Sequence, residues 1–151
     1  MITVSICFII LIGSFAATFF KTSLTTTKEM PVNQFKELKV NNADIGDYIS
    51  KNHEYWNEEL CWGRSKNYRF SVFQKNYDAY VKDLNIIITA VGDDELKSDF
   101  KHVHSLLENA AETKNIDFLI DVHRIFHDLD VNFNEYASSD YYKVTQYGGE
   151  K

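Results

Sequence analysis

Apolar side chains in one long segment recur alternately three and four positions apart, and this spacing constrains the fold more than any other feature. The residues that share it are Phe70, Phe73, Tyr77, Tyr80, Leu84, Ile87 and Val91. On an α-helix the alternation places all of them on one side, where a second helix can pack. The sequence therefore predicts a helix over 70–91, ended by Gly92 as a left-handed cap.

Three more segments carry the same period. Their apolar residues are Ile45, Tyr48, Ile49, Trp56 and Leu60 in the first, Leu96, Phe100, Val103, Leu107 and Ala110 in the second, and Phe118, Val122, Ile125, Phe126, Leu129 and Phe133 in the third. Acidic residues at 93–95 and the N-cap residue Asn115 mark the starts of the last two helices. Four helices joined by short turns predict an all-α fold, an antiparallel up-down four-helix bundle. The C-terminal tail, 140–148, is predicted to pack in an extended form across this bundle.

The first twenty residues contain no charged side chain, and a polar, lysine-containing stretch follows them. As a helix, Ile2 to Phe20 would be about 28 Å long, close to the thickness of the hydrocarbon core of a bilayer. Residues 1–20 are therefore predicted to form an apolar helix that serves as a signal peptide or a membrane anchor, with Ser14-Phe15-Ala16 as a candidate cleavage site. Residues 21–41 are predicted to be a polar spacer, and residues 42–151 to be the helical bundle domain.

The residues around the apolar segment bear on the side of the membrane where the domain lies. A terminal apolar run followed by a polar spacer is typical of a domain outside the cytoplasm, either secreted or anchored through residues 2–20. The alternative is a membrane-anchored domain that faces the cytoplasm, because no basic residue precedes the run and four lysines follow it within 21–39. We expect the extracytoplasmic location, at the envelope of a bacterial cell.

Charge and cysteine content narrow the possible functions. All 16 Lys and Arg and all 22 Asp and Glu follow residue 20, so the domain carries a net charge of −6. This balance disfavours nucleic acid and anionic membrane surfaces as partners. Cys61 is the only cysteine beyond the apolar segment, so the domain has no internal disulfide. The chain contains no glycine-rich phosphate loop and no Gly-x-Ser-x-Gly motif, so we expect no enzyme and no organic cofactor.

Histidines on the last two predicted helices are the candidate metal ligands. His123 and His127 are four residues apart, so their rings lie one helical turn apart on the same side. Asp130 extends this stripe, and His104 lies level with it if the two helices are antiparallel. His104, His123, His127 and Asp130 therefore define a possible site for zinc or another divalent transition metal.

A different interpretation of the same stripe is that it is solvated surface. His123 and His127 fall outside the apolar side of their helix, and no glutamate follows the first histidine as it does in His-Glu-x-x-His peptidases. The leading prediction is therefore a non-enzymatic, exported or tethered binding module that contacts another protein at the cell envelope. Transition-metal binding through the histidine stripe is the alternative function.

Overall fold

The computed structural model describes residues 42–138 and 140–149. The elements in chain order are α1 (Asn42–Leu60), the short 3₁₀ helix η1 (Arg64–Asn67), α2 (Phe70–Ala90), α3 (Asp94–Thr113) and α4 (Ile116–Phe133). This part of the chain contains no β-strand, so the predicted all-helical class is confirmed. The apolar segment 1–20 and the spacer 21–41 lie outside the described residues. Among the helices that are described, none has the length and apolar character needed to cross a membrane.

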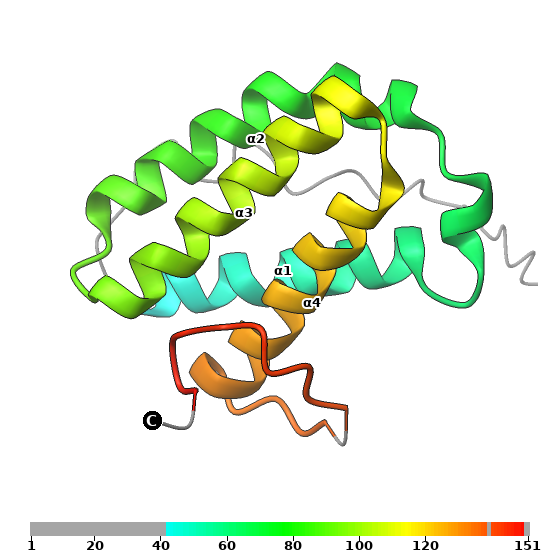
Figure 1. The fold of residues 1–151 in the computed structure, drawn as a ribbon. Coiled ribbons are helices and arrows are strands. Elements are labelled where there is room, and N and C mark those ends of the chain that lie inside the picture. Colours follow the sequence, from blue (N-terminus) through cyan, green and yellow to red (C-terminus); the bar gives the residue numbers. More distant parts are fainter. Residues whose placement is uncertain (1–41, 139, 150–151) are drawn as a thin grey trace, which may run out of the picture.

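The four long helices form one connected set of packed pairs. Figure 1 shows α2 and α3 side by side and antiparallel, with α1 passing beside α4. The closely packed pairs are α2 with α3, α3 with α4, and α4 with α1. Helix α4 therefore lies between α3 and α1 and brings residues from both ends of the domain together. A regular up-down bundle topology stays a prediction.

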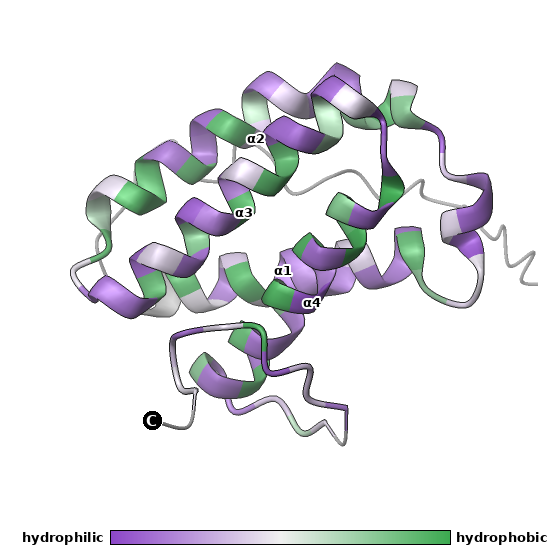
Figure 2. Cartoon of the chain, in the orientation of Figure 1, coloured by the Kyte–Doolittle hydropathy of each residue, from purple (hydrophilic) through white to green (hydrophobic). Residues whose placement is uncertain are grey.

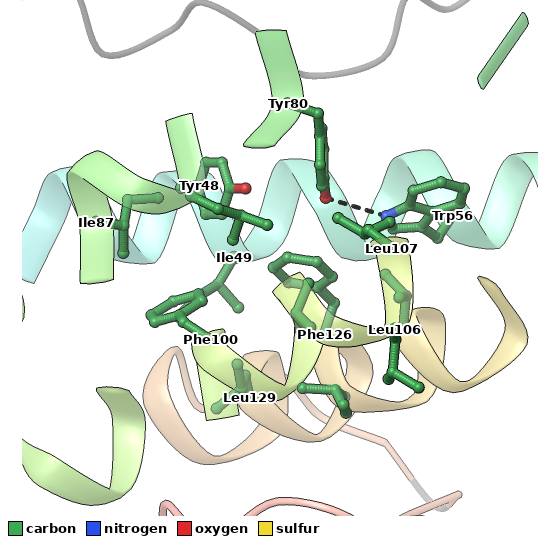
Figure 3. Close-up of a cluster of buried hydrophobic side chains, with 14 of the residues drawn as sticks. Tyr48, Ile49, Trp56, Tyr80, Ile87, Phe100, Leu106, Leu107, Phe126 and Leu129 are labelled. Atoms are coloured by element: carbon green, nitrogen blue, oxygen red, sulfur yellow. Dashed lines mark hydrogen bonds between the residues drawn. The ribbon is translucent and has the colours of Figure 1, made fainter. Parts of the chain in front are cut away.

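The apolar sides of these helices meet in one core. Hydrophobic and hydrophilic residues alternate along each helix in Figure 2, as the three-four spacing predicts. The side chains of Trp56, Tyr80 and Phe126 are fully buried, and the Trp56 indole donates a 3.2 Å hydrogen bond to the Tyr80 hydroxyl (Figure 3). Tyr48 meets the rings of Phe100 and Phe126 edge-on, with centroids 6.2 Å and 5.8 Å away. The predicted core positions of α2 and α3 are all buried or packed against this core.

The ends of the helices confirm one cap and correct another. The Asn115 side chain accepts a hydrogen bond from the Asp117 amide at 3.0 Å, as expected of the N-cap of α4. The predicted left-handed cap at Gly92 is wrong, because α2 ends at Ala90 and Gly92 is not among the residues with positive φ. Val91 is extended and only 3% exposed, so the chain leaves α2 with this side chain still in the core.

The C-terminal tail folds back onto α4 and α3 (Figure 1). Two buried aspartates accept hydrogen bonds from its backbone. Asp128 accepts hydrogen bonds from the amides of Tyr142 and Val144, both at 2.9 Å. Asp99 accepts from the amides of Gln146 and Tyr147, the latter at 2.9 Å. These carboxylates satisfy backbone donors that an extended segment cannot satisfy by itself, so they fix where the tail lies.

Candidate functional site: a buried histidine cluster

Three histidines from two helices lie together between α1 and α4. His53 comes from α1, and His123 and His127 come from α4; their exposed fractions are 6%, 5% and 6%. The ring centroid of His53 is 5.8 Å from that of His123 and 4.9 Å from that of His127. The two rings on α4 are 6.2 Å apart. We call these three residues the histidine cluster.

Asp130 binds α1 to α4 at one side of the cluster. Its carboxylate lies 2.8 Å from His53 Nδ1 and accepts hydrogen bonds from Ser50 Oγ at 2.6 Å and Asn134 Nδ2 at 2.7 Å. Burial alone would raise the pKa of Asp130, but the hydrogen bonds from His53, Ser50 and Asn134 outweigh it and lower this pKa. The aspartate is therefore a carboxylate that fixes the orientation of the His53 ring, with Nε2 on the other side.

The tail covers His127. Its Nδ1 lies 3.3 Å from Asp128 Oδ1, and its Nε2 lies 3.0 Å from Ser138 Oγ in the tail. The rings of Tyr142 and Tyr136 meet the imidazole edge-on, with centroids 4.9 Å and 6.4 Å away. Because Asp128 also holds the Tyr142 amide, the same carboxylate contacts the cluster and its cover.

His123 lies next to the free cysteine. The distance from His123 Nε2 to Cys61 Sγ is 3.8 Å. Burial, with the nearby His53, His127 and Arg124, lowers the pKa of His123 to about 4, so this imidazole is neutral at neutral pH. Burial also raises the pKa of Cys61, an effect that Arg64 only partly offsets. The pair is therefore a thiol beside a weak base, which is not the activated arrangement of a nucleophilic cysteine.

The structure brings three of the four predicted metal ligands to this region and leaves the fourth elsewhere. His123, His127 and Asp130 border the cluster, whereas His104 lines a groove with Asn85 of α2 and has its Nδ1 3.5 Å from Glu108 Oε2. Helix α3 packs against both α2 and α4, and His104 lies on the side of α3 that faces α2. In the described part of the chain, no three His, Cys, Asp or Glu side chains are already arranged to hold a metal ion.

The sequence pattern did not identify two residues of the site, and it led to a wrong prediction of the burial of two others. The interpretation of His123 and His127 as solvated surface is wrong, because α1 and the tail cover both rings. His53 and Cys61 were not expected at the site. A signal for His53 exists, since it lies four residues after Ile49 and three before Trp56, within the apolar side of α1.

Two large exposed side chains border the histidine cluster, and a third lies next to Cys61. Trp62, Tyr136 and Tyr142 are 69%, 48% and 42% exposed. Trp62 follows Cys61 directly, and both tyrosines contact the cluster from the tail. The Arg64 guanidinium lies over the Trp62 ring, 5.0 Å from its centroid. We call Trp62, Tyr136 and Tyr142 the aromatic rim.

Comparison with protein family models, with curated proteins and with solved structures found no match to this chain. Function is therefore argued from two adjacent features of the geometry. One is the buried histidine cluster with its neighbouring thiol and carboxylates. The other is the exposed aromatic rim around it.

Proposed function

We propose that residues 42–151 form a non-enzymatic binding module, built as an up-down bundle and held outside the cytoplasm at the cell envelope, where it contacts another protein. The aromatic rim is the observation that carries this proposal. Trp, Tyr and Arg are the residues that most often dominate the binding energy of protein interfaces. Here the aromatic residues lie on two irregular segments, the turn after α1 and the tail, and the guanidinium groups of Arg64 and Arg124 lie over Trp62 and Tyr142.

The backbone at Trp62 supports a binding role. Its φ is +54°, a left-handed conformation that costs an ordinary residue about 1 kcal/mol. The side chain gains little burial in return, because 69% of it is exposed. The turn therefore holds a large aromatic ring in solvent, which suits a residue that becomes buried against a partner.

The chemistry of the site supports binding over catalysis. Cys61 is a thiol with a raised pKa, and its neighbour His123 is a weak base. The net charge of −6 favours a partner with a basic surface, since unlike charges accelerate association. The apolar segment 1–20 and the polar spacer 21–41 are suited to displaying such a module from a membrane.

Site-specific crosslinking on intact cells tests this proposal. A photoreactive phenylalanine replaces Trp62 or Tyr142 in the full chain, and the same residue at the exposed Asn85 of α2 serves as the matched control. We expect one envelope protein to form an adduct at both rim positions and not at Asn85. Adding Tyr136→Ala to the Trp62 probe should reduce the adduct yield about tenfold.

Two results would contradict the proposal. An adduct at Asn85 with none at the rim would move the contact surface to α2. Absence of any specific adduct, together with hydrolytic activity in the purified chain, would replace the binding module with an enzyme. An alkaline phosphatase fusion after Lys151, active only outside the cytoplasm, checks the location independently.

A further inference from the structure

We infer that His53, His123, His127 and Cys61 together bind one tetrahedral transition-metal ion, with zinc as the best fit, between α1 and α4. This inference does not depend on the proposed protein partner. It replaces two of the ligands predicted from the sequence. His53 from α1 takes the place of His104, and Asp130 orients a ligand instead of binding the ion.

The separations of the rings are close to what a shared ion requires. Zinc binds an imidazole nitrogen at about 2.0–2.1 Å, which places the centroids of two tetrahedrally bound rings about 5 Å apart. The three ring separations in the cluster are 4.9 Å, 5.8 Å and 6.2 Å. The His53–His127 separation equals this value, and the other two are about 1 Å longer, so the rings must move closer for all three to share one ion.

The cysteine lies at a matching distance. A nitrogen and a sulfur bound to the same zinc ion, at about 2.0 Å and 2.3 Å, are about 3.6 Å apart in a tetrahedral site. His123 Nε2 and Cys61 Sγ are 3.8 Å apart. Cys61 would bind as the thiolate, releasing its proton to solvent as the metal–sulfur bond forms.

The carboxylates lie where they orient histidine ligands. Asp130 contacts Nδ1 of His53 at 2.8 Å, and Asp128 contacts Nδ1 of His127 at 3.3 Å. A histidine whose Nδ1–H is held by a carboxylate presents Nε2 as the ligand, a common arrangement around protein-bound zinc. Two such pairs within one cluster are more than simple burial of histidines requires. Their negative charges would also offset the positive charge of the ion.

The ligating atoms do not meet at one point as they stand, and the change needed is local. Ser138 Oγ now lies 3.0 Å from His127 Nε2, the atom that would bind the ion. Ser138 is exposed and belongs to the tail, so its hydroxyl can turn away while the helices stay in place. The rings of His123 and His127 must also turn about their own side-chain bonds for their nitrogens to reach an ion at Nε2 of His53.

Cobalt binding by the full chain tests the site, because Co²⁺ reports both geometry and ligand type in its absorption spectrum. A Cys7→Ser background leaves Cys61 as the only thiol. We expect one Co²⁺ per chain, with the visible bands of tetrahedral cobalt and a thiolate charge-transfer band in the near ultraviolet. Zn²⁺ should displace the cobalt and abolish both.

Variants assign each ligand. His53→Ala and His123→Ala should weaken Zn²⁺ binding more than about 100-fold, and Asp130→Asn about 10- to 100-fold. Cys61→Ser should remove the charge-transfer band and retain visible bands of lower intensity. His104→Ala is the matched control and should leave affinity and spectrum unchanged.

Three outcomes overturn the inference: no stoichiometric Co²⁺ in the parent chain, an unchanged near-ultraviolet band in Cys61→Ser, or loss of binding in His104→Ala. Circular dichroism shows whether each variant is folded. Cys61→Ser alters a half-buried side chain at the end of α1 and keeps the test decisive if a histidine variant unfolds.

Discussion

The buried side chains of the domain form two regions of opposite character. We call the hydrophobic core the apolar interior, and the histidine cluster with its aspartates the polar interior. Around Trp56, Tyr80 and Phe126 the buried side chains are aromatic and aliphatic, and the Trp56 indole donates a hydrogen bond to the Tyr80 hydroxyl. At the histidine cluster between α1 and α4, by contrast, three histidines and two aspartates are buried. Burying ionisable groups costs free energy even when they are paired, so the second interior is a poor way to stabilise a small domain. We therefore assign the stability of the fold to the apolar core, and the histidine cluster to the metal binding inferred above.

The largest expected effect tests the apolar interior. Leu84 is fully buried on α2, and Leu84→Ala should lower the free energy of unfolding by about 2–5 kcal/mol through lost burial and the cavity left behind. Urea denaturation of the full chain measures this. The loss should be the same with and without zinc, because Leu84 is on α2 and the cluster is formed by α1 and α4. A loss below about 1 kcal/mol would show that the core does not hold the fold.

Metal removal tests the polar interior. Zinc at 100 times its dissociation constant should stabilise the folded chain by about 3 kcal/mol, and a chelator should remove this increment. Leu84→Ala should retain the increment, whereas His53→Ala should lack it. Thermal unfolding with and without chelator measures the difference for each variant. Equal melting temperatures for the parent chain under both conditions would contradict metal binding by the histidine cluster.

The apolar interior was predictable from the sequence because helical periodicity decides which side of a helix is buried. The positions predicted on α1, from Ile45 to Leu60, are buried as expected. The polar interior was only half predictable, since periodicity does not reveal which helices become neighbours. His123 and His127 were identified by their spacing, but their third partner, His53, is on α1 and meets them only because α1 packs on α4. The cover over His127 was not predictable, because it depends on where Asp128 and Asp99 hold the tail.

A smaller expected effect tests whether Asp99 and Asp128 hold separate parts of the tail or whether the tail is released as one unit. Asp99→Ala removes the acceptor of the Gln146 and Tyr147 amides and should cost about 1–2 kcal/mol of stability. Hydrogen exchange should accelerate at these two amides. Exchange at the Tyr142 and Val144 amides, which Asp128 holds, should change less. Equal acceleration at all four amides would mean that the tail is released as one unit.

The smallest effect concerns the turns, where two glycines differ. Gly92 has no positive φ, and a Cβ added there meets nothing within 4 Å, so Gly92→Val should change stability by less than about 0.5 kcal/mol. Gly63 has φ of +82° and equally open surroundings, so the cost of Gly63→Val, about 1 kcal/mol, comes from the backbone alone. Paired urea titrations of the two variants measure this difference. The turn at Gly63 also holds Trp62 outward, so Gly63→Val should lower crosslinking at the rim, and Gly92→Val should not. If Gly92→Val proved the more costly change, the extended exit from α2 described here would be wrong, and a left-handed cap would have to replace it.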